Sequence, residues 1–396
     1  MRLGSGKHIK VILFTLLLLL LILPSLGYGN ENKEALQSSI KLIKTETIDK
    51  TCWGVKAIIA SKDDSRFYSI NLEGLSVYEF NRDTKKILRK LVFVANPGKG
   101  FNYNKKEWFD SYQEKPVEAL FTHEGRYLWL SLHNAGGVVV WDLEDDDTFI
   151  EGRPFKEAWL HDMSSGSPSK KKIRLLWIKT NTTPKVIAAT PDEKYLFVSN
   201  WHSNTVSVLD ISSSSPKDWV EIKELGPSPI PRGMVASADS RLLYLGQMGS
   251  DHISVIDLEN FKKLRSINVG INPRHLIRFG DYIYCSLNLG AKLVKIDTTT
   301  EKVIQKTSTG RSPRTISITK DGKYIFVTCY NENQLQAFDA DSLQLIGSWE
   351  SNGHPVAAEV FQDGDFIEVW VGNHTHGTVK VFTFKEDSFS KEVTPQ

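Results

Sequence analysis

Cysteine is scarce in this sequence of 396 residues, where only Cys52, Cys285 and Cys329 occur. No two of them form a C-x-x-C pair, and this argues against both a disulfide framework and a zinc site. Cys285 and Cys329 fall in apolar stretches with strand-like alternation. We therefore predict that they are buried free thiols, which pack as small apolar groups.

An excess of charge of one sign is also missing, because 49 basic residues face 47 acidic ones, a net charge of +2. The first 27 residues hold three basic residues and no acid, so the remainder has 46 basic and 47 acidic residues, or −1. A near-neutral chain has no general attraction for nucleic acid or anionic lipid. Binding to either would require a local patch of positive charge.

Sequence motifs of known catalytic centres are lacking as well. The chain contains no G-x-S-x-G, no P-loop, no H-E-x-x-H and no C-x-x-C-H haem attachment motif. Serine, histidine and aspartate are present, but no spacing ties them into a triad. We accordingly assign no catalytic and no metal-binding residues.

The first 29 residues have the layout of a secretory signal peptide. Arg2, Lys7 and Lys10 precede an apolar run over residues 11–23, which Pro24 and small residues follow. We therefore expect an exported protein, periplasmic, secreted or on the cell surface, with no transmembrane span after cleavage. The alternative is a retained anchor, although the run is short for a bilayer, which needs about 20 residues.

A repeated pattern occupies most of the chain beyond residue 50, and it reads apolar, any, apolar, large apolar and usually an acid. Seven copies begin at Leu75, Val138, Val206, Ile253, Leu293, Leu335 and Val379. About fifteen residues before each copy lies another apolar strand, and a turn signal precedes that strand. Earlier still, six units open with a proline, which suits the first position of a strand.

Each unit thus predicts a four-stranded antiparallel meander that cannot bury both of its faces alone. Stacking such sheets around an axis covers the faces, and closing the ring removes the free ends. We predict an all-β fold, a seven-bladed β-propeller over residues 51–390, followed by a tail at 391–396. Within the N-terminal segment 30–50, residues 40–49 alternate like a strand. This strand is expected to complete the last blade beside residues 378–384.

The segments 194–210 and 323–331, which read KYLFVSNWHSNTVSVLD and KYIFVTCYN, resemble YVTN repeats of extracytoplasmic, YncE-like β-propellers. The resemblance covers about residues 51–385 and is strongest in the last five units. It implies the propeller fold. It does not imply one function, since such propellers include binding proteins, lactonases and cofactor enzymes.

Two sets of residues are expected on one face of the ring, where the innermost strands begin and the turns between second and third strands lie. The first set comes directly after the opening prolines and is basic in four successive blades: Lys185, Arg232, Arg274 and Arg314. The other blades have Val55, Val117 and Val356 at this position. The second set lies on the turns and comprises Asn71, His133, Asn134, Trp201, His202, Met248, Asn288, Tyr330, Asn331, His374 and His376. The cations suit a carboxylate, phosphate or polyanion, and the rings with polar tips suit sugar, nucleotide or peptide contacts. Alternatively, the cations pair with acids or backbone carbonyls of neighbouring blades and the turn residues serve the turns themselves.

Two insertions interrupt the plain repeat. The segment 96–115 is rich in rings, namely Phe101, Tyr103, Trp108, Phe109 and Tyr112, and is expected on the same face as a lid or as a partner patch. The segment 144–172 is acidic and then basic, and is expected at the rim or on the opposite face, without an assigned role.

These observations favour a non-enzymatic, monomeric binding protein without a cofactor. Its partner would be an envelope or extracellular protein, a glycan or another anionic ligand, with nucleic acid as a further alternative. The resemblance also allows a lactonase-like hydrolase, in which Arg232, Arg274, His202 and Glu118 are the candidates. A haem- or metal-dependent redox propeller is the third interpretation.

Overall fold

The computed structural model describes residues 39–102, 105–164 and 168–387. Strands account for its regular structure apart from one short 3-10 turn at Pro216–Asp218. No helix among these residues is long and apolar enough to cross a membrane. The predicted leader, residues 1–29, lies outside the described residues.

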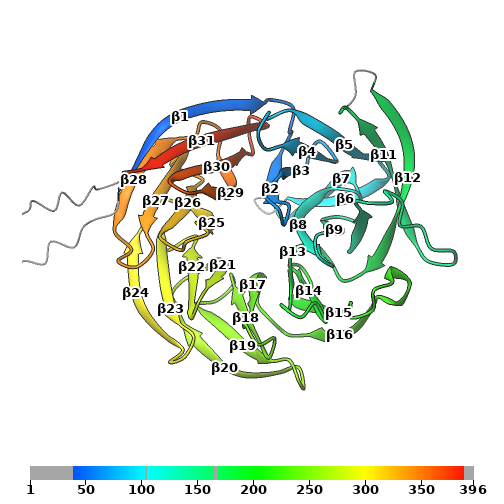
Figure 1. The fold of residues 1–396 in the computed structure, drawn as a ribbon. Coiled ribbons are helices and arrows are strands. Elements are labelled where there is room, and N and C mark those ends of the chain that lie inside the picture. Colours follow the sequence, from blue (N-terminus) through cyan, green and yellow to red (C-terminus); the bar gives the residue numbers. More distant parts are fainter. Residues whose placement is uncertain (1–38, 103–104, 165–167, 388–396) are drawn as a thin grey trace, which may run out of the picture. The chain divides into compact units, whose positions relative to one another are not determined.

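The strands form seven antiparallel blades arranged in a ring (Figure 1). Blade 1 comprises β2 (Val55–Ala60), β3 (Arg66–Asn71), β4 (Ser76–Asn81) and β5 (Ile87–Phe93). Blade 2 comprises β8 (Pro116–Thr122), β9 (Tyr127–Leu132), β10 (Gly137–Asp142) and β12 (Ser169–Lys179). Blade 3 comprises β13 (Pro184–Ala189), β14 (Tyr195–Asn200), β15 (Thr205–Asp210) and β16 (Val220–Leu225). In each of these blades the strand named first is the innermost one.

The remaining blades have the same order from the centre outwards. Blade 4 is β17 (Pro231–Ala236), β18 (Leu242–Gln247), β19 (His252–Asp257) and β20 (Lys262–Asn268). Blade 5 is β21 (Pro273–Phe279), β22 (Tyr282–Leu287), β23 (Lys292–Asp297) and β24 (Lys302–Ser308). Blade 6 is β25 (Pro313–Ile318), β26 (Tyr324–Cys329), β27 (Gln334–Asp339) and β28 (Leu345–Glu350). Blade 7 is β29 (Pro355–Asp363), β30 (Phe366–Asn373), β31 (Thr378–Glu386) and β1 (Ile40–Asp49).

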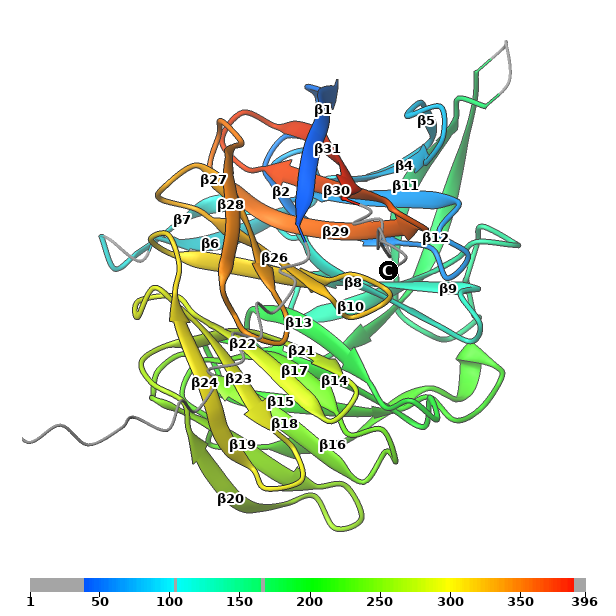
Figure 2. The same ribbon diagram turned by 60° about the vertical axis from the view of Figure 1, so that its left-hand side comes forward.

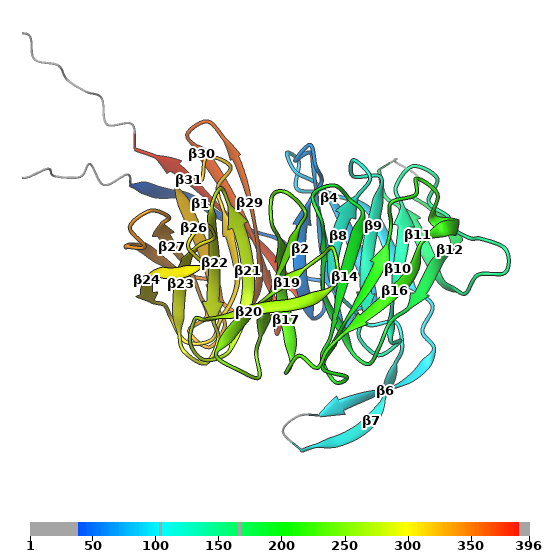
Figure 3. The ribbon, with the colours of Figure 1, turned by 90° about the horizontal axis from the view of Figure 1, so that it is seen from below.

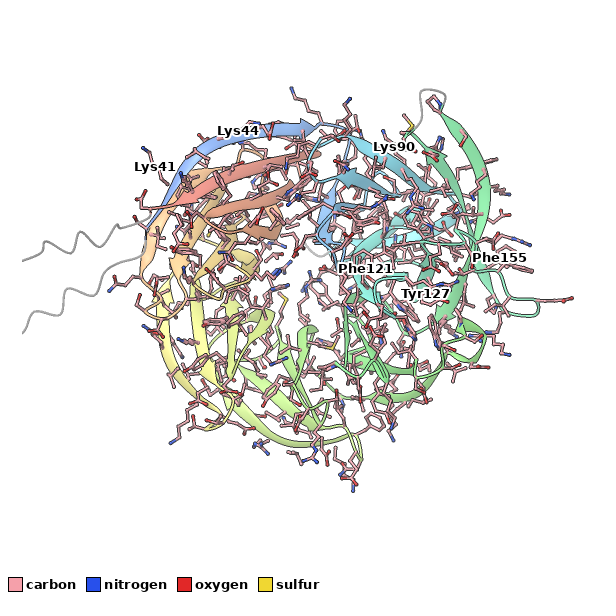
Figure 4. All side chains as sticks on the ribbon, viewed as in Figure 1. Lys41, Lys44, Lys90, Phe121, Tyr127 and Phe155 are labelled. Carbon is pink, nitrogen blue, oxygen red and sulfur yellow. The ribbon has the colours of Figure 1, made fainter. Side chains whose placement is uncertain are left out.

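The N-terminal strand closes the ring as the alternation of residues 40–49 predicts. β1 pairs antiparallel with β31, from Ile40 opposite Glu386 to Asp49 opposite Val379 (Figures 1 and 2). Lys41 and Lys44 point outward from this outermost strand (Figure 4). Exposed lysines on an edge strand discourage pairing with another chain.

The core is divided among the joints between blades. Each of the seven joints holds one cluster of buried apolar residues. At the joint of blades 7 and 1, Phe67 stacks on Trp370 with ring centroids 4.4 Å apart. All three cysteines are free and buried, so the prediction for Cys285 and Cys329 is confirmed and extends to Cys52.

The second insertion forms strands at the outer edge of the ring. β11 (Phe155–Asp162) pairs with β5 of blade 1 and with β12 of blade 2, joining the two blades into one nine-stranded sheet. Its charged residues are largely engaged, since Asp146 meets Arg89 at 2.9 Å and Lys171 at 2.6 Å. The predicted rim position thus agrees with the structure, but the segment also braces two blades.

Candidate functional site: a cationic mouth on the top face

The turns between second and third strands and the starts of the innermost strands share one face, here called the top face. Backbone hydrogen bonds tie the two together within a blade. The N–H of Trp201 donates to Thr183 O at 3.0 Å, that of Met248 to Ile230 O at 2.9 Å, and that of Tyr330 to Ser312 O at 3.1 Å. The two predicted sets of residues therefore lie on the same face.

Every innermost strand carries a register shift directly after its first residue. In blade 1, for example, Val55 pairs with Asn71 but Ala57 pairs with Ile70, so Lys56 is an extra residue. A bulge of this kind breaks the simple alternation of side chains and redirects them locally. The shifts occur at the height of the ring where the basic residues stand.

Five cations from five blades meet at the centre of the top face and are called the cationic mouth: Lys56, Lys185, Arg232, Arg274 and Arg314. Lys185, Arg232 and Arg274 are buried, with 7%, 9% and 8% of their surface exposed. Side chains of the surrounding strands narrow the centre of the ring (Figure 4). Like charges are thus held close together in a partly dehydrated space.

The pKa values of these groups report both the burial and the repulsion. Burial, followed by the charges of Arg314, Arg274 and Arg232, lowers the pKa of Lys56 to about 7. The pKa of Lys185 is well below its ordinary value because of its burial and of nearby Arg232. For Arg314, burial and then Arg232 lower the pKa to about 10. The charged form of each group is therefore disfavoured in the unliganded fold.

One carboxylate stands among these cations. Glu118, on β8, accepts a hydrogen bond from Arg232 Nη2 at 2.8 Å. Glu73 is at the periphery, where Lys115 Nζ approaches it at 2.7 Å. The five basic side chains consequently outnumber the carboxylates that the described residues supply around them.

Aromatic rings and imidazoles surround the mouth. Lys185 Nζ lies 4.7 Å from the ring centre of Trp201, and the Arg314 guanidinium lies 4.2 Å from that of Tyr330. Lys185 Nζ is 2.7 Å from His133 Nδ1, and Lys56 Nζ is 3.4 Å from His374 Nε2.

Two buried nitrogens at the mouth have no hydrogen-bond partner within the described part of the chain, namely Arg314 Nε and His374 Nδ1. Burial, followed by repulsion from Lys56, lowers the pKa of His374 to about 4, so this imidazole is neutral at pH 7. A polar nitrogen buried without a partner costs free energy. An anion that accepts a hydrogen bond from Arg314 Nε would remove this cost at that position.

A channel continues from the mouth through the ring. Its cavity of about 530 Å³ is lined by residues of all seven innermost strands, including Glu118, His275 and Glu359. Burial and the neighbouring Arg232 lower the pKa of His275 to about 3. At the far side, burial and then Asp64 raise the pKa of Glu359 to about 8.

The first insertion forms a β-hairpin, β6 (Pro97–Asn102) and β7 (Glu107–Tyr112), which projects from one face of the ring (Figure 3). That face is the top face, because Asn134 Nδ2 of the blade 2 turn donates to Tyr112 O at 2.8 Å. Phe101 and Trp108 contact the ring of His202, with centroids 5.3 and 6.1 Å apart. They also line a cavity of about 370 Å³ beside blades 2 and 3.

The other rings of the hairpin face solvent. Phe109 and Tyr112 are 46% and 49% exposed, and Trp108 is 58% exposed despite its contact with His202. Tyr103 lies outside the described residues. The hairpin therefore has the features of both interpretations, a cover over blade 3 and an exposed aromatic surface.

Among the residues singled out from the sequence, Lys185, Arg232, Arg274, Arg314, Trp201, Tyr330 and His374 gather around the mouth. His202 lies farther out, where its Nδ1 is 2.5 Å from Thr183 Oγ1 and its ring meets the hairpin. Asn331 Nδ2 donates to Ser312 Oγ at 2.8 Å and so ties the blade 6 turn to the loop before β25. Their role in binding stays a prediction.

Lys56 is the member of the mouth that the sequence pattern missed. Its blade opens on Gly54 and Val55 rather than on proline and a cation, and the charge comes one residue later. The same offset places Glu118 one residue after Val117 in blade 2. A search for charge at the second and third positions of each innermost strand would have found both residues.

The described residues contain no group of three or more His, Cys, Asp or Glu side chains arranged to hold a metal ion. What the mouth offers chemically is a set of N–H donors and positive charge. Such a set binds carboxylate, phosphate or sulfate oxygens through charge-assisted hydrogen bonds.

Comparisons with known proteins agree with the repeats. A family model of YNCE-like β-propellers matches residues 223–358, and one of seven-bladed β-propeller lactonases matches residues 116–271. Antigen Lp49 of Leptospira interrogans is 23% identical over 241 residues, which are 54% of this chain and 52% of that protein. The match thus spans about half the length of this curated relative.

One solved structure supports the propeller architecture at low identity. The β-propeller domain of Cps50 (Swd1) from Myceliophteria thermophila has a TM-score of 0.63 at 13% identity, covering 85% of this chain and 99% of that one. Hydrazine synthase of Kuenenia stuttgartiensis has a TM-score of 0.49 at 22% identity, covering 65% of this chain and 74% of that one. By its repeats and its seven blades the chain is a seven-bladed β-propeller, and over parts of its length it is similar to YNCE-like and to lactonase β-propellers.

Proposed function

We propose that this chain is an exported binding protein that holds an anionic ligand at the cationic mouth. The observation that carries the proposal is the charge balance, five buried or half-buried cations around one carboxylate, Glu118. Burying charge without a counter-charge is costly, so a folded protein rarely retains such a cluster unless something neutralises it. A bound anion would supply the missing charge.

The expected export rests on the first 29 residues and on the proteins that the chain resembles. The YncE-like match and the name of the Leptospira relative, an antigen, are in keeping with a position outside the cytoplasm. Expression with and without residues 1–29, followed by fractionation, tests this part. Retention of the full-length chain in the cytoplasm would contradict it.

Calorimetric titration with inorganic phosphate and with citrate tests the binding itself. Replacing Arg274, which is buried in the mouth, by methionine should weaken binding about 10-fold or more, because a hydrogen bond to a charged group contributes about 1.5–3 kcal/mol. The matched control is Arg241→Met, since that side chain is 83% exposed and 3.9 Å from Asp239. Equal affinities for wild type and Arg274→Met would contradict the proposal.

A lactonase-like hydrolase is the second candidate, favoured by the family match over residues 116–271 and by Glu118, Arg232 and His133 at the mouth. In that case Glu118 would have to act as a base, although Arg232 already binds its carboxylate. Hydrolysis of a δ-lactone that is lost in Glu118→Gln would select this candidate. Lactone turnover no faster than the spontaneous reaction would remove it.

A further inference from the structure

Exposed apolar side chains surround the cationic mouth on the top face. Trp53 precedes the innermost strand of blade 1, Ile230 that of blade 4 and Ile271 that of blade 5, with 57%, 38% and 63% of their surface exposed. Leu289 lies on the turn of blade 5 and is 72% exposed. With Trp108, Phe109 and Tyr112 of the hairpin they form what is called the apolar rim.

The members of the apolar rim share the top face because backbone bonds fix them there. Trp53 O accepts from Glu73 N–H and Gly74 N–H of the blade 1 turn, at 3.1 and 3.0 Å. The N–H of Ile230 donates to Asn204 Oδ1 at 2.9 Å, and its carbonyl accepts from Met248. These bonds hold Ile230 at φ 48°, a conformation that β-branched residues rarely adopt. The exposed position of this isoleucine is thus built into the loop.

Charge at the periphery of the top face is balanced, unlike charge at its centre. Lys115 pairs with Glu73 at 2.7 Å, Arg311 with Glu332 at 2.5 Å, and Lys99 with Asp110 at 2.5 Å. Positive potential is therefore concentrated at one point, the mouth. A single compact anionic group fits this pattern better than an extended polyanion, which is bound by cations that follow its backbone.

The apolar rim extends over opposite sides of the ring, from blade 1 and the hairpin to blades 4 and 5 (Figure 1). A small amphiphile cannot contact all of it, whereas a protein surface can. Aliphatic side chains such as Ile271 and Leu289 do not stack on bases, but they are ordinary contacts at the centre of protein interfaces.

We propose that the occupant of the top face is a protein partner that inserts one acidic side chain into the cationic mouth and rests apolar side chains on the apolar rim. This inference builds on the proposed function, because it names the class of ligand whose anionic group the mouth would hold.

Selection of random displayed peptides on the immobilised full chain tests the inference. Enriched peptides should carry an acidic residue flanked by apolar ones. Leu289→Asn should weaken their binding about 10-fold, since the variant no longer offers this apolar side chain for burial against the peptide. The same variant should leave the affinity for inorganic phosphate unchanged. Ile304→Asn, at a residue 50% exposed on the outermost strand β24, is the matched control and should change neither.

The outcomes separate this inference from the function on which it rests. Suppose that phosphate binding depends on Arg274, but the enriched peptides lack acidic residues or bind Leu289→Asn as tightly as the wild type. This result would overturn the inference and leave the proposed function standing. If no peptide is enriched but an oligothymidylate binds and its binding depends on Arg274, the partner is a nucleic acid and not a protein. If the wild-type protein binds neither phosphate nor any enriched peptide, both proposals are overturned.

Discussion

Arg232 of blade 4 donates a hydrogen bond to Glu118 of blade 2 at 2.8 Å, bypassing blade 3, whose Lys185 stands in the same mouth. The two strands that carry this pair are far apart in sequence. The pair therefore links blades 2 and 4 across the mouth and at the same time supplies the carboxylate that stands among the five basic side chains.

Replacing Glu118 by glutamine should show separately how its negative charge affects anion binding and how it affects stability. In Glu118→Gln the side-chain oxygen can still accept from Arg232, but the negative charge is lost. We expect phosphate affinity to rise several-fold and the melting temperature to fall, because the cations repel one another without compensation. Titration calorimetry and thermal unfolding measure the two effects. Glu73→Gln, at the periphery, is the control and should change both much less.

Arg274→Met should show the opposite combination. Burial and then the charges of Arg314 and Arg232 lower the pKa of this guanidinium well below its ordinary value. A methionine of similar length would relieve that repulsion, so the free energy of unfolding of the unliganded protein should increase while anion affinity falls. Denaturant unfolding measures the change, with Arg241→Met as the neutral control. A less stable Arg274→Met protein would show that the arginine supports the fold instead.

The fold can be predicted from the sequence because strand alternation, turn signals and opening prolines repeat at nearly constant spacing. Four members of the mouth can be predicted as well, since Lys185, Arg232, Arg274 and Arg314 occupy one position of the repeat. Lys56 falls one residue beyond that position, where a register shift lies between Val55 and Ala57, so a search limited to the residue after the opening proline misses it. The sheet that joins blades 1 and 2 could not be predicted either, because the charged run Lys170–Lys172 near the start of β12 does not look like a strand.

Anion affinity should depend on pH through Lys56. Burial and the nearby arginines lower the pKa of this ammonium group to about 7, so it is charged below pH 7 and neutral above. Raising the pH from 6 to 9 removes one positive charge from the mouth, so sulfate, whose own charge is constant over this range, should bind more weakly at the higher pH. Lys56→Met should flatten the profile measured by calorimetry. An unchanged profile in this variant would assign the effect to another group.

The stability of the unliganded protein should change with pH in the opposite sense over the same range. A lysine in the unfolded chain has a pKa of about 10.4, above the value of about 7 for folded Lys56. Between these values the unfolded chain binds a proton that the folded chain does not, so the free energy of unfolding rises with pH. Denaturant unfolding at several pH values should show a smaller rise in Lys56→Met.

Glu359, on the channel wall, predicts a separate effect on stability. Burial and then Asp64 raise its pKa to about 8, whereas a glutamate in the unfolded chain has a pKa of about 4.3. Between these values the folded chain holds the extra proton, so this group makes the fold less stable as the pH rises. Glu359→Gln should remove that loss and raise the melting temperature at pH 7.5 more than at pH 4.5. If Glu359→Gln changes the melting temperature equally at both pH values, the raised pKa of Glu359 is contradicted.

Closure of the ring by β1 gives the last prediction. β31 pairs with β1 along nearly its whole length, and Ile40 is only 7% exposed in the cluster that joins blades 6 and 7. A chain that begins at Thr51 would leave β31 as an open edge, and exposed edges pair with other chains. We expect such a chain to melt at lower temperature and to associate in light scattering, whereas a chain that begins at Ser39, and so keeps β1, should show neither effect. A synthetic peptide of residues 39–50, added to the shortened chain, should restore the melting temperature, because the strand contributes through pairing and burial rather than through its covalent connection. Failure of the shortened chain to lose stability would show that three strands suffice for blade 7.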